Sequence, residues 1–337
     1  MPGVQTSVSG YTRDQTLPPG SPLCLGGTVA TLTERLIDTN GVQLRVVEAG
    51  ERGAPVVLLA HGFPELAYSW RKQIPVLADA GYHVLAPDQR GYGGSSRPDE
   101  VTAYDIVALT GDLAGLLDDV GAPRAVVVGH DWGSPVATNF ALLHPDRVAG
   151  LVNLSVPPVP RASAPPTQIW RKTFGDQFFY ILYFQEPGVA DAELGRDPRD
   201  SLQRMLSFEG FAAPASELAG RPLPPLPAWL TEAEFEHYVE AFTRTGFTGG
   251  LNWYRNFDRN WELTARTPAD TVTVPTLFVA GTADPVLSFT PRHRVGDLIT
   301  GDYREALLEG AGHWLQQERP DEVNGLLLEF LSGVRWA

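Results

Sequence analysis

The sequence is poor in cysteine, since Cys24 is the only one among 337 residues. A single thiol cannot form a disulfide within the chain, and it excludes a zinc site built from several cysteines. This scarcity fits a reducing compartment, and we expect the protein in the cytoplasm. The sequence also lacks the ~18 consecutive apolar residues that a membrane-spanning helix requires, and its start lacks the pattern of a secretory signal.

Positive charge is scarce as well. Lys and Arg number 26 against 40 Asp and Glu, which gives a net charge of −14. A surface this acidic repels phosphate groups, which argues against a nucleic-acid partner and against anchoring on anionic lipid. The chain does contain 43% hydrophobic residues, with 8 Trp, 10 Tyr and 15 Phe, and this is ample material for a core. The composition therefore indicates a globular protein, and it is compatible with a monomer or a homodimer.

Short apolar runs alternate with helical patterns over much of the chain. The runs are rich in β-branched residues and apolar on both faces, as buried parallel strands require. Apolar residues at helical spacing over 106–120 and 134–143 predict helices between them. This alternation predicts an α/β fold with a mostly parallel sheet. The expected strands lie at 42–47, 55–60, 83–86, 125–128, 148–154, 276–280 and 303–308.

The alternation stops between the strands at 148–154 and 276–280. A proline-dense linker opens this stretch, which then becomes aromatic and helical. Thr231 and Glu234 have the spacing of a capping box at the start of a helix. We therefore predict an inserted helical lid within an α/β core. The predicted parts are a flexible leader at 1–30, a core formed by 31–157 and 271–337, and a lid at 158–270.

The strongest local signal is the segment Gly129-His130-Asp131-Trp132-Gly133, between a predicted strand and a predicted helix. A sharp turn from strand to helix needs small residues two positions before and two positions after the turn residue, and the two glycines supply them. Asp131 then stands at the turn with an exposed side chain, where a nucleophile elbow usually carries serine. Aspartate at this position can also cap the helix, so the segment alone leaves both roles open.

A nucleophile needs a histidine base and an acid that orients the base. Among the seven histidines, only His61 and His313 fall in loops after strands, where sites in α/β proteins form, and we select His313. Asp284 follows the predicted strand at 276–280 and supplies the acid. The chain order nucleophile, acid, histidine is the order expected for this fold. Asp131, Asp284 and His313 are therefore the predicted catalytic triad.

The loop His61-Gly62-Phe63-Pro64 directly follows the predicted strand at 55–60. It places the backbone N–H of Phe63 beside the elbow, where this group and the N–H of Trp132 form the predicted oxyanion hole. A carboxylate nucleophile attacks an sp3 carbon that bears a leaving group, and it forms an alkyl ester. Water activated by His313 then hydrolyses this ester. The leaving group is an epoxide oxygen or a halide.

Four segments together resemble the α/β-hydrolase-fold epoxide hydrolases, and they lie at 61–65, 129–133, 183–188 and 252–256. The similarity runs from about Thr33 to the end of the chain. It is closer to bacterial enzymes of the mycobacterial A type than to the hydrolase domain of the mammalian soluble enzyme. The resemblance implies hydrolysis of small hydrophobic epoxides by water to vicinal diols, without a metal or an organic cofactor.

The resemblance also implies roles for the lid. In this family two lid tyrosines hydrogen-bond the epoxide oxygen, and the matching positions are Tyr183 and Tyr254. Tyr180 and Tyr238 are expected to pack within the lid. The aromatic side chains of Phe63, Trp132 and Trp314 are expected to line an apolar substrate pocket.

Two alternatives remain open. A haloalkane dehalogenase uses the same nucleophile, although such enzymes usually carry a polar residue where Phe63 stands and need no paired lid tyrosines. A non-catalytic binding protein of the same fold can retain the triad, so Asp131, Asp284 and His313 weaken this alternative without excluding it.

Overall fold

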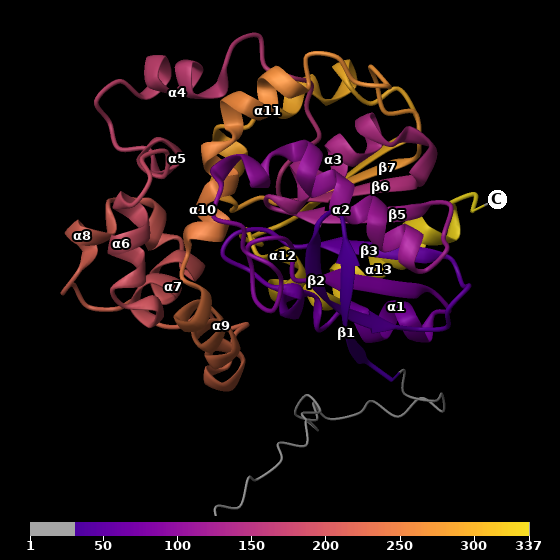
Figure 1. Cartoon of the computed structure of the whole chain (residues 1–337), viewed down its shortest axis with the longest axis horizontal. Coiled ribbons are helices and arrows are strands. Elements are labelled where there is room, and N and C mark those ends of the chain that lie inside the picture. Colours follow the sequence, from indigo (N-terminus) through magenta and orange to yellow (C-terminus); the bar gives the residue numbers. More distant parts are fainter. Residues whose placement is uncertain (1–30, 337) are drawn as a thin grey trace, which may run out of the picture.

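The computed structural model describes residues 31–336, so the predicted leader at 1–30 lies outside the described residues. An eight-stranded sheet forms the centre of the fold, in the order β1-β2-β4-β3-β5-β6-β7-β8 (Figure 1). β2 pairs antiparallel with β1 and β4, and the remaining neighbours pair in parallel. The predicted mostly parallel sheet is confirmed. The strands are β1 (Thr33–Thr39), β2 (Val42–Ala49), β3 (Val56–Ala60), β4 (His83–Pro87), β5 (Ala125–His130), β6 (Val148–Leu154), β7 (Thr276–Gly281) and β8 (Tyr303–Leu308).

Each predicted strand coincides with a strand of the sheet, and β1 is an additional one. The central strands are apolar on both faces because both faces are covered, and every residue of β3 and β5 is buried. β1 lies at the edge of the sheet and leaves most of its side chains exposed, including Leu36. It therefore carries no apolar run by which the sequence could have predicted it.

Helices cover the two faces of the sheet. Leu58 of β3 and Val127 of β5 join the cluster that includes α2 (Ile106–Asp119) and α3 (Gly133–Leu143). Their neighbours Val57 and Val126 point to the opposite face, because side chains alternate along a strand. There they pack with α1 (Ile74–Asp79) and α13 (Pro320–Ser332). The helices predicted at 106–120 and 134–143 are α2 and α3.

The described chain between β6 and β7 is helical and contains no strand of the sheet. We call this segment, Pro166–Leu263, the helical insertion; it lies beside the sheet (Figure 1). The predicted capping box is confirmed, since the Glu234 N–H donates to Thr231 Oγ1 and the Thr231 N–H donates to Glu234 Oε2. The insertion comprises α4 (Pro166–Phe174), α5 (Tyr180–Tyr183), α6 (Val189–Gly195), α7 (Pro198–Leu206), α8 (Ala215–Leu218), α9 (Glu232–Thr245), α10 (Thr248–Arg255) and α11 (Phe257–Leu263).

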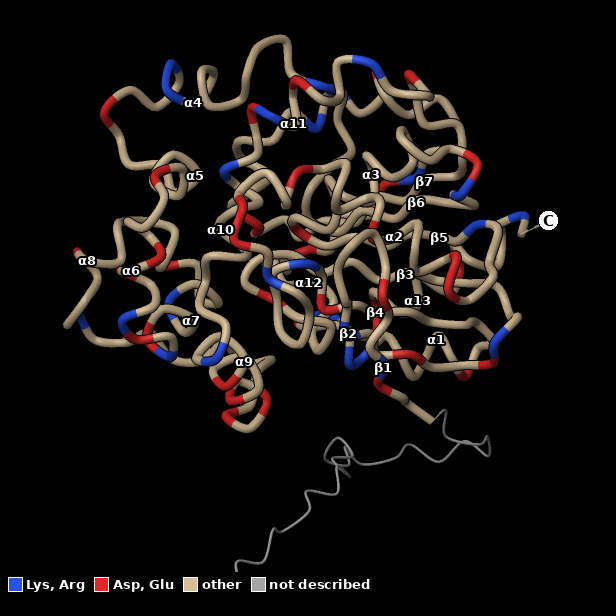
Figure 2. The backbone as a smooth tube through the Cα atoms, in the orientation of Figure 1, with Lys and Arg blue, Asp and Glu red and all other residues tan. Residues whose placement is uncertain are grey.

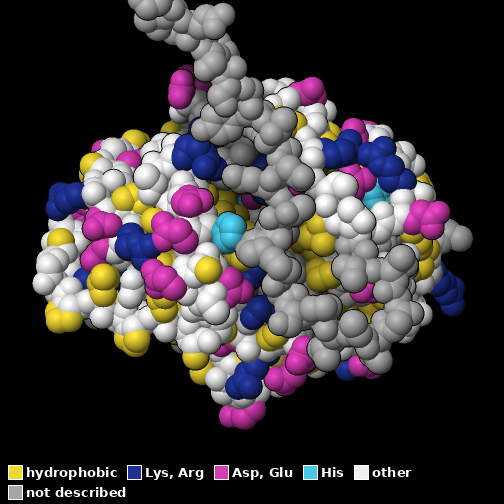
Figure 3. Space-filling view, turned by 90° about the horizontal axis from the view of Figure 1, so that it is seen from below, with side chains coloured by type: hydrophobic (Ala, Val, Ile, Leu, Met, Phe, Trp, Pro, Cys, Tyr) yellow, Lys and Arg dark blue, Asp and Glu magenta, His cyan; other side chains and the backbone are white. Residues whose placement is uncertain are grey.

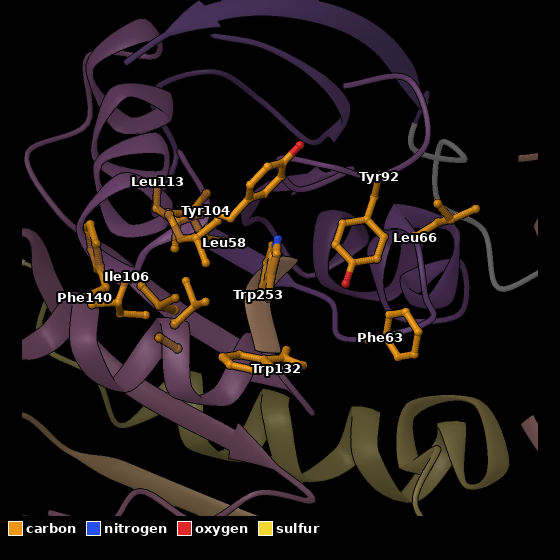
Figure 4. Packing of buried hydrophobic residues seen from close by; sticks show 14 of the residues in the cluster. Leu58, Phe63, Leu66, Tyr92, Tyr104, Ile106, Leu113, Trp132, Phe140 and Trp253 are labelled. Atoms are coloured by element: carbon orange, nitrogen blue, oxygen red, sulfur yellow. The ribbon is translucent and has the colours of Figure 1, made fainter. Parts of the chain in front are cut away.

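The insertion and the sheet domain share one hydrophobic cluster. Trp253 of α10 lies among side chains of the sheet domain, near Trp132 and Tyr92 (Figure 4). Its indole N–H donates to the carbonyl of Arg90 at 3.0 Å. A second contact joins α9 to the sheet domain, where the guanidinium of Arg71 lies 2.8 Å from the carboxylate of Glu234. These contacts fix the insertion over one end of the sheet.

The central strands β3, β4, β5, β6 and β7 contain no Asp, Glu, Lys or Arg. Acidic residues gather along α9 (Figure 2). On the face shown in Figure 3, Lys and Arg side chains lie among Asp and Glu side chains. Within residues 31–336, no helix combines the length and the apolar character that crossing a membrane requires.

The turn from β5 into α3 brings the helix very close to the sheet. A Cβ placed on Gly129 would lie 2.1 Å from the carbonyl oxygen of Gly133, and one on Gly133 would lie 1.9 Å from that of Ala60. Both neighbours are backbone atoms, which cannot move without moving the strand or the helix. A larger residue at position 129 or 133 would therefore overlap the neighbouring backbone.

We expect Gly129→Ala to lower the free energy of unfolding by at least about 2 kcal/mol, because the added methyl group overlaps the α3 backbone. Gly325→Ala is the matched control, because Gly325 lies in α13 with nothing near its Cβ position. It should stabilise the protein by about 0.5–1 kcal/mol through helix propensity. Urea unfolding measures both, and equal stabilities of the two variants would contradict the close approach.

Candidate active site

Asp131 occupies the turn between β5 and α3. Its backbone is left-handed, with φ of 49°, a conformation that non-glycine residues rarely adopt. This strain holds the carboxylate above the end of the sheet, where Oδ1 accepts the N–H of Phe63 at 2.8 Å. The side chain is 14% exposed, so a small molecule can still reach it.

The loop that carries Phe63 lies against the nucleophile because residue 62 has no side chain. A Cβ on Gly62 would lie 2.3 Å from Asp131 Oδ1. The following peptide bond, Phe63-Pro64, is cis. Trp132 precedes the first turn of α3, where helix N–H groups have no partner within the helix. The predicted oxyanion-hole amides, those of Phe63 and Trp132, thus flank Asp131.

Asp284 and His313 reach the same place from β7 and β8. Asp284 Oδ2 accepts Nδ1–H of His313 at 2.8 Å, while its Oδ1 accepts the Val286 N–H at 2.8 Å. This second bond fixes the carboxylate, and the first fixes the imidazole. His313 Nε2 then lies 3.4 Å from Asp131 Oδ2, longer than an ordinary hydrogen bond. The structure therefore brings together the three residues of the predicted triad.

The charges of this triad determine the protonation of His313. Burial disfavours the charged imidazolium, but the carboxylates of Asp284 and Asp131 outweigh burial and raise the pKa of His313 to about 10. At neutral pH His313 is therefore protonated between two anions. It can act as a base only after one of these negative charges is removed.

His61, the other histidine in a loop after a strand, has both ring nitrogens engaged. Its Nδ1–H donates to the carbonyl of Gly62 at 2.8 Å, and its Nε2 accepts the N–H of Gln89 at 2.9 Å. Burial lowers the pKa of His61, in keeping with the neutral ring that these bonds require. These contacts give His61 a structural role, and they favour His313 as the base.

A buried polar network that the sequence analysis did not single out holds His313. The carbonyl of His313 accepts Nε2–H of His130 at 2.8 Å. On its other side, His130 Nδ1–H donates to Glu65 Oε2 at 2.6 Å. Burial alone would raise the pKa of Glu65, but the neighbouring His130 outweighs it and lowers that pKa. Glu65 follows the oxyanion loop directly in the sequence, and this proximity was the available signal.

Tyr254 of α10, one of the two predicted lid tyrosines, lies in the aromatic cluster beside Asp131. Its ring packs edge-on against Phe63 and Trp132, with centroid distances of 5.5 and 5.1 Å. Burial, together with the negative charge of Asp131, raises the pKa of Tyr254 well above its ordinary value. The phenol is therefore protonated at neutral pH and can donate its proton.

The structure contradicts the placement of Tyr183 beside the substrate. Its hydroxyl donates to Glu193 Oε2 on α6 at 2.6 Å, so it is already used within the insertion. Tyr180, at the start of the same short helix, faces the site instead. Burial and then the charges of Asp131 and Asp284 raise the pKa of Tyr180. Both tyrosines occupy one four-residue helix, and their spacing alone could not show which one faces the carboxylates.

The predicted pocket aromatics differ in their contacts. Phe63 and Trp132 both pack against Tyr254, directly beside Asp131. Trp314 packs edge-on against the His313 ring at 4.8 Å, and its indole N–H donates to the carbonyl of Leu206 on α7. Trp314 therefore ties the loop that carries His313 to the insertion.

Comparison with known proteins shows where similar chains occur. A model described as the alpha/beta hydrolase fold matches residues 55–320. Epoxide hydrolase A of Mycobacterium tuberculosis is 65% identical over 317 residues, which cover 90% of this chain and 98% of that protein. The bifunctional epoxide hydrolase 2 of Rattus norvegicus is 37% identical and matches 87% of this chain but 54% of that longer protein.

Solved structures agree with these comparisons. The crystal structure of epoxide hydrolase A from Mycobacterium thermoresistibile superposes with a TM-score of 0.86 at 59% identity. It covers 90% of this chain and 99% of that one. An epoxide hydrolase from an endophytic Streptomyces gives a TM-score of 0.83 at 43% identity, over 90% of this chain and 96% of that one.

We expect Asp131→Asn to lower the pKa of His313 from about 10 toward its ordinary value of 6.5, because the amide removes one of the two negative charges beside it. The raised pKa of His313 also makes the stability of the folded protein depend on pH. The raised pKa contributes stability that is fully present below about pH 6.5 and is lost as the pH rises through about 10. Asp131→Asn should reduce this contribution.

Titration of the His313 ring by NMR measures the pKa in the intact protein. Asp118→Asn is the control, because Asp118 pairs with Arg147 on the surface and should leave the His313 titration unchanged. Titration of His313 near 6.5 in the parent protein would refute the proposed charge coupling.

Proposed function

The chain belongs to the α/β-hydrolase-fold family and is an epoxide hydrolase, and we propose that Asp131, Asp284, His313, Tyr180 and Tyr254 carry out its chemistry. The observation that carries this proposal is the position of Asp131. Its carboxylate is accessible, lies next to the charged pair of His313 and Asp284, and faces two protonated phenols. A carboxylate so placed can open an epoxide, and the same site can hydrolyse the resulting ester.

In the first step, an oxygen of Asp131 attacks one carbon of the epoxide. The bond between that carbon and the epoxide oxygen breaks, and its electron pair stays on the oxygen. An alkoxide is a poor leaving group, so a proton must be supplied as the bond breaks. Tyr180 and Tyr254 hold their protons at neutral pH and supply one of them, which leaves a neutral hydroxy ester on Asp131.

Formation of this ester prepares the second step. Asp131 loses its negative charge, so one of the two carboxylates that raise the pKa of His313 disappears. The imidazolium then gives up its proton, which restores the phenol that was deprotonated in ring opening, and the neutral imidazole becomes a base. His313 Nε2 takes a proton from water, and the hydroxide attacks the ester carbonyl carbon. The N–H groups of Phe63 and Trp132 stabilise the oxyanion. Its collapse breaks the bond between the carbonyl carbon and the substrate oxygen, which takes the proton from His313 and leaves as the vicinal diol. Asp131 then returns its proton to His313, which restores the carboxylate and the imidazolium.

The surroundings of Asp131 favour a hydrophobic substrate. Phe63, Trp132 and Tyr254 present aromatic faces and edges beside the carboxylate, and they offer few polar groups to a substrate's side chains. We assign residues 158–270 as the lid that completes this pocket, with 31–157 and 271–337 as the core. In this assignment Trp314 positions His313 in addition to lining the pocket.

The setting of the enzyme is also part of the proposal. Its partners are a small hydrophobic epoxide and water, and the protein acts in the cytoplasm as a monomer or a homodimer. The single cysteine supports a reducing compartment, and the acidic net charge of −14 argues against nucleic-acid partners.

We expect a His313→Gln variant to accumulate an ester on Asp131 when it is mixed with styrene oxide, because ring opening proceeds while water activation fails. Intact mass spectrometry should show a gain equal to the whole mass of the epoxide. Asp131→Asn in the same background should abolish the gain.

Other outcomes of this experiment point elsewhere. A gain equal to a haloalkane minus hydrogen halide, with no gain from the epoxide, would make the dehalogenase chemistry correct. No adduct with either substrate would refute Asp131 as the nucleophile.

Substitution of the two α5 tyrosines separates their roles. Tyr180→Phe should slow ester formation by about 10- to 100-fold, because it removes one of the two proton donors. Tyr183→Phe is the matched control and should slow it far less, since it breaks only the bond to Glu193. Rapid-quench measurement of the adduct gives both rates, and a larger loss for Tyr183→Phe would reverse the assignment.

A further inference from the structure

The two segments that carry the proposed phenols are joined by one side chain. Gln185 lies just after α5, and its Nε2 donates to the carbonyl of Ile181 at 2.9 Å. The same nitrogen donates to the carbonyl of Tyr254 on α10, also at 2.9 Å. Ile181 is the residue after Tyr180, so a single amide bridges the backbone beside one phenol and the backbone of the other.

The chemistry of this contact fixes the orientation of the amide. Both partners are carbonyl oxygens, which only accept hydrogen bonds. The amide nitrogen of Gln185 has two hydrogens and satisfies both, whereas its oxygen in the same place would repel both. Neither a carboxylate nor an apolar side chain of similar length can replace it. The contact therefore requires a donor group with two hydrogens, which the amide of Gln185 supplies.

The helix that carries Tyr180 depends on such external contacts. α5 has four residues, which is too short to be stable alone, and no side chain caps its start. Phe184 packs against both phenol rings, with centroid distances of 5.6 Å to Tyr180 and 5.0 Å to Tyr254. Packing of rings restrains their separation, but it leaves sliding and rotation open. The directional bonds of Gln185 restrain those movements.

Gln185 also supplies a hydrogen bond at the end of α10, where it contacts the carbonyl of Tyr254. The carbonyl of Tyr254 lies in the last turn of α10, where the N–H of Asn256 at the helix end is shared between it and the carbonyl of Trp253. Gln185 provides a donor there. Arg255 adds a second link between the same two segments, because its Nε–H donates to the carbonyl of Phe184 at 3.1 Å. Of these links, that of Gln185 reaches the residue of the catalytic phenol itself.

We propose that Gln185 is a positioning residue that sets the relative placement of the Tyr180 and Tyr254 hydroxyls for ring opening. This inference rests on the proposed function, in which both phenols serve the epoxide oxygen. Gln185 acts through the two backbones it joins, because its side chain donates to the carbonyls of Ile181 and Tyr254. Because the phenols act in ring opening and not in water activation, loss of Gln185 affects the first step alone.

The test compares Gln185→Met with Gln203→Met in the full-length protein. Gln203 is a matched control, because its Nε2 donates to one carbonyl of the same insertion, that of Pro224, which belongs to neither α5 nor α10. In the His313→Gln background, the rate of adduct formation with styrene oxide reports ring opening. With His313 present, decay of the ester in a single turnover reports hydrolysis.

Gln185→Met is expected to slow adduct formation by about 10-fold or more and to change ester decay by less than about 2-fold. Gln203→Met should leave both rates unchanged. Gln185→Glu, which has the shape but lacks the donors at neutral pH, should behave like Gln185→Met. In a Tyr254→Phe background, where one phenol is already absent, Gln185→Met should cause a smaller further loss.

Melting temperatures of the two methionine variants show whether each is folded. The inference is overturned if adduct formation in folded Gln185→Met equals that in Gln203→Met, or if ring opening and ester decay slow equally. An equal loss in the parent and the Tyr254→Phe backgrounds would also overturn it. Absence of an adduct in the parent His313→Gln protein is a different result, which would refute the proposed function itself.

Discussion

The active site depends on the backbone of Asp131, which is held in the left-handed region between β5 and α3. This conformation is strained for aspartate, and it persists because the surroundings leave no alternative. Gly129 and Gly133 let the helix approach the sheet to within backbone contact, and Gly62 lets the neighbouring loop reach the carboxylate. The same close approach that strains the backbone exposes the nucleophile and brings the N–H of Phe63 to it. The close packing of α3 against the sheet thus both shapes the fold at this turn and exposes the carboxylate of Asp131.

Charge determines the order of the two chemical steps. With Asp131 and Asp284 both ionised, His313 is held as an imidazolium and leaves the nucleophile free to react as a carboxylate. In the proposed mechanism, the ester removes one charge and allows His313 to act as a base. The site does not need a separate device to prevent early water activation, because the charge of the nucleophile itself suppresses it. The Glu65–His130 pair, which holds the His313 carbonyl, keeps the ring in place through both states.

Much of this arrangement could be predicted from the sequence, because the features concerned are local. The buried strands are apolar on both faces, and the turn glycines around Asp131 and the chain order of Asp284 and His313 can be recognised in the sequence. Other features depend on tertiary contacts. The choice between Tyr180 and Tyr183 depends on how a four-residue helix is rotated, and Glu193 decides it by binding one hydroxyl. The edge strand β1 and the buried Glu65–His130 pair likewise follow from neighbours distant in sequence.

The two steps draw on different parts of the molecule. Asp131, Asp284 and His313 all follow strands of one sheet, so their geometry is as rigid as the sheet. The amides of Phe63 and Trp132, which the proposed ester hydrolysis also uses, follow strands of the same sheet. The proposed ring opening also uses the phenols of Tyr180 and Tyr254, which come from short helices of the insertion. Their placement is restrained by side chains such as Gln185 rather than by strand pairing. Changes in the insertion can therefore alter which epoxides are opened, and how fast, while the hydrolytic half of the reaction stays intact.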